Sequence, residues 1–208
     1  MNKLSNLFTK TIKAKNIYLF LLLIFIIGVI FGSLFITIIN DTDKNTVLNQ
    51  ITNFFNEMKS NKIDYLDIFK NSVISNLIYI TFIWFLGISI IGIPIIIIML
   101  FIKGFMIGFS IASIIANYKF LGILGSLSYI FPHIILSIIV ILLISYHALK
   151  LSINLLKSVI NKKNINFNEI INRYSMIMLI SVIGMIIISL TEAFINPYII
   201  KLFTILLK

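Results

Sequence analysis

Residues 73–116 read VISNLIYI TFIWFLGISI IGIPIIIIML FIKGFMIGFS IASIIA, with Lys103 as their one charged side chain. The run is too long for a single membrane-spanning helix of about 20 residues, and it suits two. Gly92-Ile93-Pro94 divides it, because proline lacks the N–H that a helix needs and restricts the residue before it. We therefore predict two transmembrane helices, 73–91 and 95–116. A re-entrant break at 91–95 stays open, since so apolar a turn is unusual at a membrane interface.

The composition of the whole chain also indicates a membrane protein. Its 208 residues are 60% hydrophobic and 12% charged, and the mean hydropathy is +1.09. A soluble domain of this size has too little interior to bury so much apolar surface. The net charge of +10 would suggest nucleic acid in a soluble protein. Here the lysines lie between apolar runs, so we expect membrane lipid, and no nucleic acid, as a partner.

Three further apolar runs extend the prediction to an all-α, polytopic integral membrane protein with about five transmembrane helices. The predicted spans are 17–39, 73–91, 95–116, 123–145 and 174–196. The polar segments between and before them are 1–16, 40–72 and 146–173. The first run is longer than the apolar core of a signal peptide, and no small-residue cleavage motif follows it. We therefore expect a retained anchor rather than a cleaved leader.

Charge asymmetry predicts the orientation of these helices. The positive-inside rule places the four lysines of residues 1–16 in the cytoplasm, and the acidic segment 40–72 is then extracytoplasmic. The segment 146–173 carries five basic residues against Glu169 alone. Five crossings return this segment to the cytoplasm, whereas four would leave it outside. We expect a cytoplasmic N-terminus and an extracytoplasmic C-terminus, with Pro197 just after the last span.

The segment 40–72 predicts an extracytoplasmic amphipathic helix. Its apolar residues fall at helical spacing: Val47, Leu48, Ile51, Phe54, Phe55 and Met58. One interpretation is a helix that lies on the membrane or on the other helices of the chain. The other is a docking surface for a partner, with Phe54, Phe55 and Met58 as its contacts, because amphipathicity does not say what the apolar face meets.

Small residues recur at four-residue spacing in two of the predicted spans. Gly104 and Gly108 begin such a ridge, and Gly28 and Gly32 repeat the spacing in the first helix. Small residues let helix backbones approach closely in a membrane, where the lipid supplies no hydrophobic drive for association. The ridge predicts a close helix contact. The contact is either within the monomer, in a homo-oligomer, or with a partner's membrane helix.

Two charged residues lie inside predicted spans, and such residues are functional hypotheses by default. Counted from the cytoplasmic ends, Lys103 lies roughly 12 Å deep and Glu192 roughly 27 Å at the helical rise. We therefore expect no direct ion pair between them. His133 and His147 are the chain's imidazoles, without acidic neighbours in sequence, and cysteine is absent. No nucleophile, base and orienting group can all be named, so we expect neither an enzyme nor a bound metal or cofactor.

A family resemblance is carried by Trp84-Phe85-Leu86-Gly87, Ile91-Gly92-Ile93-Pro94, Leu100-Phe101-Ile102-Lys103-Gly104-Phe105 and Gly108-Phe109. Ile17-Tyr18-Leu19-Phe20 and Gly28-Val29-Ile30-Phe31-Gly32 precede this block, and Glu192-Ala193-Phe194-Ile195-Asn196-Pro197 closes the pattern. Over nearly its whole length the chain resembles the stage II sporulation protein M family. The broader family often has a glycine and a glutamate after Pro132-His133, where this chain has Ile134 and Ser137. This departure fits a sporulation-type member.

The resemblance implies a non-catalytic scaffold of the engulfment machinery in endospore formation. Family members lie in the mother-cell membrane at the sporulation septum and recruit the peptidoglycan-cleaving stage II sporulation proteins P and D. We expect residues 40–72 to contact such a wall hydrolase, and the faces around Gly104 and Trp84 to hold a partner's membrane anchor. A small transporter or channel-like component of the broader family is the alternative. The candidate packing and interaction positions are Gly28, Gly32, Phe54, Phe55, Met58, Trp84, Gly87, Gly92, Pro94, Lys103, Gly104, Gly108, Glu192 and Pro197.

Overall fold

The computed structural model describes residues 2–59, 64–130, 132–161 and 167–206, and every regular element within them is a helix. In chain order these are α1 (Asn2–Ile38), α2 (Asp41–Lys59), α3 (Tyr65–Gly87), α4 (Gly92–Ile130), α5 (His133–Asn161), α6 (Phe167–Leu190), the π-helix η1 (Thr191–Ile195) and α7 (Asn196–Leu206). Five helical stretches of this part of the chain are long and apolar enough to cross a membrane: Lys15–Ile38, Tyr65–Gly87, Gly92–Ile130, His133–Ile160 and Asn168–Thr204. The predicted all-α fold with five such helices is confirmed.

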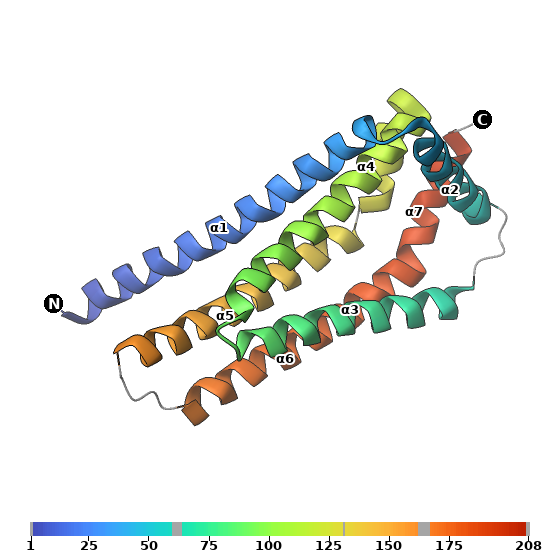
Figure 1. Ribbon diagram of the computed structural model, residues 1–208. Coiled ribbons are helices and arrows are strands. Elements are labelled where there is room, and N and C mark those ends of the chain that lie inside the picture. Colours follow the sequence, from blue (N-terminus) through green and yellow to red (C-terminus); the bar gives the residue numbers. More distant parts are fainter. Residues whose placement is uncertain (1, 60–63, 131, 162–166, 207–208) are drawn as a thin grey trace.

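The long helices form one elongated bundle with two distinct ends (Figure 1). The start of α1, the turn between α3 and α4, the end of α5 and the start of α6 share one end, which we call the basic end. The short helix α2 and the end of α7 lie at the other, which we call the α2 end. The N-terminus and the C-terminus therefore lie at opposite ends of the bundle (Figure 1). Lys62, Lys162 and Lys163, which entered the charge argument, lie outside the described residues.

The apolar stretch around Gly92 forms a turn, because α3 and α4 run in opposite directions on either side of it (Figure 1). The Gly92 N–H donates to the Ser89 carbonyl at 3.1 Å. From α5, the Ser152 hydroxyl donates to the carbonyls of Gly87 at 3.0 Å and Ser89 at 2.8 Å. Buried carbonyl groups need such partners, and Ser152 supplies them without charge. The predicted separation into two helices is therefore found here, and the depth of the turn in the membrane stays a prediction.

The chain reverses at Lys119, inside the connection predicted between the spans 95–116 and 123–145, but the helix that follows is not continuous. Lys119 has φ 51° and ψ −124°, which breaks α4 into two parts. Residues 120–130 then run back from the α2 end toward the middle of the bundle, and α5 starts at His133, just after Pro132 (Figure 1). The expected span 123–145 is thus split between the end of α4 and the start of α5. Proline disrupts a helix interior, which accounts for the second break.

Helix α3 begins eight positions earlier than the predicted start at residue 73, at Tyr65. The Asp64 carboxylate accepts hydrogen bonds from the N–H groups of Leu66 and Asp67, both at 3.1 Å. This is an N-cap, in which a side chain satisfies donors that have no partner within the helix. Residues 65–72, which the predicted boundaries placed in the extracytoplasmic segment, are therefore the first part of a helix that is long and apolar enough to span a membrane.

The two glycine pairs pack against each other across the contact of α1 with α4. A Cβ atom at Gly28 would come within 3.0 Å of the Phe101 carbonyl oxygen, and one at Gly104 within 3.0 Å of that of Phe25. A Cβ atom at Gly32 would likewise clash with the Phe105 carbonyl oxygen, and one at Gly108 with that of Val29. The small-residue ridge is therefore covered by the chain's own first helix. Its glycines are not open to a partner's membrane anchor, as the alternative interpretation required.

The apolar face of α2 packs on the α2 end of the bundle. Phe55 is 2% exposed and forms a cluster with Ile114 of α4 and with Ile200 and Phe203 of α7. Ile51, Phe54 and Met58 pack against that cluster. Of the two interpretations of the amphipathic segment, packing on the chain's own helices is the one found. The side chain of Phe55 is therefore not a surface contact for another protein.

Candidate functional site

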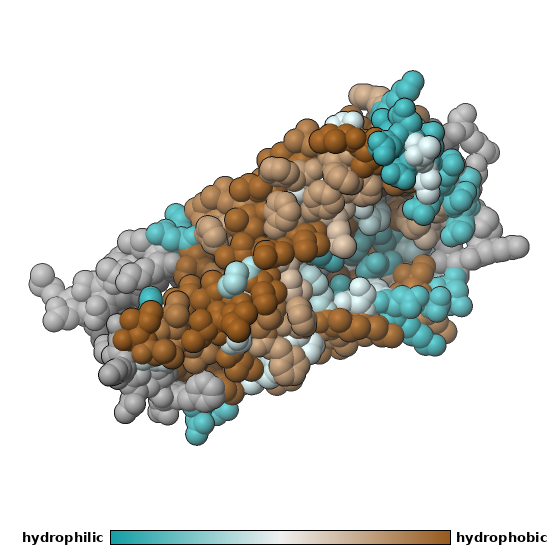
Figure 2. Space-filling model, in the orientation of Figure 1, coloured by the Kyte–Doolittle hydropathy of each residue, from teal (hydrophilic) through white to brown (hydrophobic). Residues whose placement is uncertain are grey.

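A polar cavity of about 680 Å³ lies among α3, α4, α5 and η1. It contains the charged side chains Lys103 and Glu192, together with His133. Its polar lining also includes Asn71, Ser72, Ser75, Asn76, Ser110, Tyr129 and Ser137. In Figure 2, hydrophilic colours occupy a recess between two hydrophobic bands toward the α2 end. Polar and ionisable groups within a membrane bundle gather where they line a functional site or a path for a solute.

Glu192 reaches the cavity from the π-helix η1. Its carboxylate accepts a hydrogen bond from the Ser72 hydroxyl of α3. The Ser72 and Ser189 hydroxyl oxygens lie 2.9 Å apart in a second hydrogen bond, and the Asn76 amide donates to both serines at 3.2 Å. This network connects α3 to the last transmembrane segment.

The position of Pro197 explains the wider turn that carries Glu192. Proline cannot donate a backbone hydrogen bond, and its ring clashes with the carbonyl four residues earlier. The Asn196 N–H bonds to the Thr191 carbonyl, five residues back. The helix thereby continues through Pro197 to Leu206 instead of ending at residue 196 as predicted. Single π-turns of this kind occur often at functional sites.

Lys103 enters the cavity from the opposite wall, on α4. Its Nζ lies 5.4 Å from the ring centroid of Tyr79, and the Tyr79 hydroxyl donates to the Met99 carbonyl at 3.1 Å. A lysine over an aromatic face gains a cation–π attraction. No carboxylate of the described residues lies within 4.0 Å of the Lys103 Nζ atom. The expected absence of a direct Lys103–Glu192 pair agrees with this geometry, although the two side chains share one cavity.

The last part of α4, residues 120–130, and the start of α5 complete the wall. Tyr129 precedes the helix break, His133 follows it, and their rings lie 6.0 Å apart in an edge-to-face arrangement. His133 has no acidic neighbour in sequence, but in three dimensions Glu192 lines the same cavity. His147 lies elsewhere on α5, where its Nδ1 is 3.0 Å from the Leu143 carbonyl oxygen.

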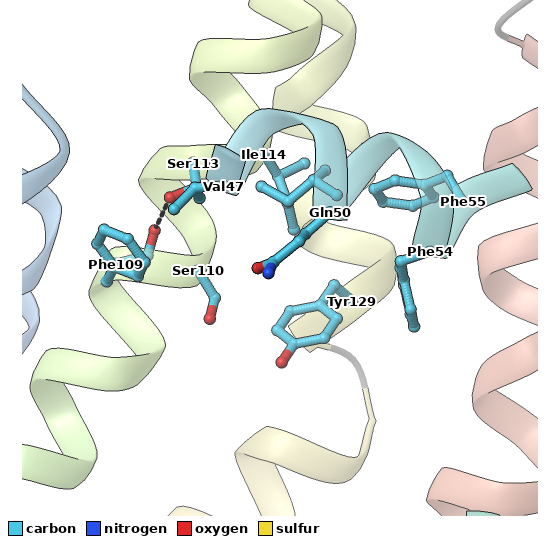
Figure 3. Close-up of a pocket in the computed structure, with 10 residues that line it drawn as sticks. Val47, Gln50, Phe54, Phe55, Phe109, Ser110, Ser113, Ile114 and Tyr129 are labelled. Atoms are coloured by element: carbon cyan, nitrogen blue, oxygen red, sulfur yellow. Dashed lines mark hydrogen bonds between the residues drawn. The ribbon is translucent and has the colours of Figure 1, made fainter. Parts of the chain in front are cut away.

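A second cavity, of about 280 Å³, lies directly under α2 (Figure 3). Val47, Gln50, Phe54 and Phe55 of α2 face Ser113, Ile114 and Tyr129 of α4 across it (Figure 3). Phe109, Ser110 and Tyr129 line both cavities. The hydroxyl groups of Ser110 and Tyr129 therefore stand in the wall between the polar cavity and the space covered by α2.

The other predicted positions lie outside these cavities. Trp84 stacks on Tyr174 of α6 with 5.9 Å between ring centroids, and the Tyr174 hydroxyl donates to the Trp84 carbonyl at 3.0 Å. A Cβ atom at Gly87 would meet the Tyr174 hydroxyl, and one at Gly92 would meet the Leu86 carbonyl. These residues, with Pro94 in the first turn of α4, shape the α3–α4 turn at the basic end.

Sequence reasoning named Lys103 and Glu192 but not the residues that surround them. Ser72, Asn76, Ser110 and Tyr129 are of residue types that occur throughout the chain, and they lie on different helices. One signal was available: Ser72 and Asn76 are four positions apart, so they share a face of one helix. The pairing of that face with Glu192 depends on tertiary structure.

Comparison with known proteins identifies a family. The family model described as Stage II sporulation protein M matches residues 21–197, which is most of the chain. No curated protein and no solved structure matches the chain significantly.

Proposed function

The chain belongs to the stage II sporulation protein M family, and on this basis we propose that it is a non-catalytic membrane scaffold of the engulfment machinery. It recruits and positions the septal peptidoglycan-degrading enzymes, stage II sporulation proteins P and D, during endospore formation. The family match over residues 21–197 carries this proposal. A scaffold needs a rigid membrane body with an exposed surface on the side of the wall, and the bundle with α2 across one end suits that task.

The distribution of charge supports an orientation with the α2 end outside the cytoplasm. Lys15, Lys157 and Arg173 are exposed near the basic end, whereas Asp41, Asp43 and Asp67 lie on α2 and at the start of α3. Cytoplasmic segments carry the excess of lysine and arginine in membrane proteins. In this orientation the N-terminus is in the mother-cell cytoplasm and the C-terminus faces the septal wall.

The outer face of α2 is the contact surface that we propose for the wall hydrolase. The inner, apolar face is covered by α4 and α7, so the hypothesis based on Phe54, Phe55 and Met58 is replaced. Asn45, Asn49, Asn53 and Asn56 are all exposed, and their spacing places them along one face of the helix. Amide side chains carry both donors and acceptors, which suits a polar protein contact.

Affinity purification from sporulating cells tests this proposal. The intact chain is expected to co-purify with stage II sporulation proteins P and D, and the double variant Asn49→Arg/Asn53→Arg is expected to lose them. Both positions are exposed, so the variant should still insert and fold. Asn168→Arg places the same change on an exposed site near the basic end and should keep both partners. Equal recovery of the two hydrolases with the intact chain, the double variant and Asn168→Arg would overturn the proposed surface. Failure of the intact chain to recover either hydrolase would overturn the scaffold proposal.

One observation favours a second candidate function, a small transporter or channel-like component. The polar cavity lies within the bundle, next to a broken helix and a π-turn, and such interrupted helices form the solute sites of many transporters. Solute flux into liposomes that contain the purified chain alone would support a transporter. A scaffold predicts no flux and a requirement for partners.

A further inference from the structure

We propose that the polar cavity binds a small zwitterion, a ligand that carries one anionic group for Lys103 and one ammonium group for Glu192. Both side chains line the same cavity of about 680 Å³. Binding sites for small molecules are typically about 300–1,000 Å³ and carry a few polar groups on apolar walls. Met106, Ile107, Ile134 and Ile188 supply apolar wall here. This inference goes beyond the scaffold role and does not depend on it.

The separation of the two charges is the main argument. Lys103 has the Tyr79 ring as its neighbour at 5.4 Å and no carboxylate within 4.0 Å, while Glu192 accepts a hydrogen bond from Ser72. Charged residues inside a membrane span are costly, so two separated charges are retained at a cost. A ligand with both charges compensates both residues at once. A ligand with a single charge leaves the other residue uncompensated.

The uncharged polar side chains of the cavity can form hydrogen bonds with the same ligand. Ser110, Tyr129, His133 and Ser137 provide donors and acceptors on the side of the cavity formed by α4 and α5. The backbone there is irregular, because α4 ends at Ile130, next to Tyr129, and α5 starts at His133. Non-helical backbone within a membrane bundle is tolerated where protein buries it or where it lines a cavity. The irregular segment is therefore consistent with a built binding site.

Two sources can supply this chemistry. One is a free amino acid or short peptide, and the other is the headgroup of a zwitterionic lipid such as phosphatidylethanolamine. The wall shared with the cavity under α2, formed by Phe109, Ser110 and Tyr129, lies toward the α2 end.

Binding by the purified full chain in phosphatidylglycerol nanodiscs tests the proposal. The probes are labelled L-alanine and L-alanyl-L-alanine, with N-acetyl-L-alanine as the anion-only analogue and L-alaninamide as the cation-only analogue. A parallel arm measures phosphatidylethanolamine retained by the chain with native mass spectrometry. We expect saturable binding of a zwitterion from one source, with single-charge analogues roughly tenfold weaker or more, a difference of about 1.4 kcal/mol. No saturable binding in either arm, or equal binding of the single-charge analogues, would overturn the proposal.

Two variants show whether the named charges make the contacts. Lys103→Gln should weaken the zwitterion roughly tenfold or more and leave the cation-only analogue unchanged, while Glu192→Gln should spare the anion-only analogue. A misfolded chain would lose all ligands together, so this pattern separates recognition from folding. Lys150→Gln is the matched control, because Lys150 lies 5.5 Å from the Tyr146 ring in a similar cation–π contact away from the cavity. Unchanged binding by Lys103→Gln would contradict the assignment. Co-purification of the wall hydrolases is measured in a separate experiment. The scaffold proposal and the ligand-site proposal can therefore be contradicted independently.

Discussion

The Glu192 carboxylate accepts a hydrogen bond from the Ser72 hydroxyl across 120 positions of sequence. Ser72 lies on α3 and is 7% exposed, and Glu192 lies on the π-helix that precedes Pro197. Through this bond and the adjoining Ser189 and Asn76, the last transmembrane segment is held against α3. The same network forms one wall of the polar cavity, so stability and the candidate site are connected at this point.

Ser72→Ala should lower the free energy of unfolding. Hydrogen bonds to charged groups contribute about 1.5–3 kcal/mol, and the variant leaves Glu192 with one donor fewer in a partly buried place. Ser33→Ala is the control, because the Ser33 hydroxyl bonds only to the Ile30 carbonyl of its own helix. Thermal unfolding in detergent measures the difference. Equal midpoints for the two variants would show that the Ser72–Glu192 bond carries little stability.

Gly108→Ala should separate α1 from α4. The added methyl group would meet the Val29 backbone, which cannot move aside as a flexible side chain can. Overpacking of this kind costs about 1–3 kcal/mol. Gly184→Ala is a matched control, since its methyl group would meet only the Val140 side chain, at 3.1 Å and 3.7 Å. Crosslinking between α1 and α4 should fall for Gly108→Ala alone; retention of the crosslink would contradict the packing described.

Phe55→Ala should detach α2 from the bundle. The Phe55 ring is 2% exposed among Ile114, Ile200 and Phe203. Replacing a buried phenylalanine by alanine lowers the free energy of unfolding by about 3–5 kcal/mol. Phe120→Ala removes the same side chain where it is 80% exposed and should have little effect. Hydrogen exchange in α2 is the measurement. An unchanged exchange rate in Phe55→Ala would mean that the cluster does not hold α2.

Single cysteines can test the proposed orientation, because the chain has none of its own. Asn45→Cys on α2 and Lys157→Cys near the end of α5 are both at exposed positions. A membrane-impermeant maleimide should label Asn45→Cys on intact protoplasts, and Lys157→Cys only after permeabilisation. The reverse pattern would invert the topology, and labelling of both on intact cells would contradict an odd number of crossings between them.

The predictable parts of the fold were those set by local composition. Apolar runs, Gly92-Ile93-Pro94 and the charge of the connecting segments predicted five helices and the α3–α4 turn, and the glycine pairs predicted a close contact. The reversal near Lys119 was expected between two spans, but the break between Ile130 and His133 was missed, because residues 123–145 form one apolar run. The polar cavity could not be predicted from the sequence for another reason. It is lined by serines, Asn76, Tyr129 and His133, which lie on separate helices and meet Lys103 and Glu192 only in the folded chain.

The most direct test of the scaffold is the position of a wall hydrolase in sporulating cells. Fluorescently tagged stage II sporulation protein P is followed in cells with this chain, without it, and with Asn49→Arg/Asn53→Arg. We predict accumulation at the septum with the intact chain, and dispersal around the mother-cell membrane in its absence or with the double variant. Septal accumulation of the enzyme in cells that lack the chain would contradict recruitment by it.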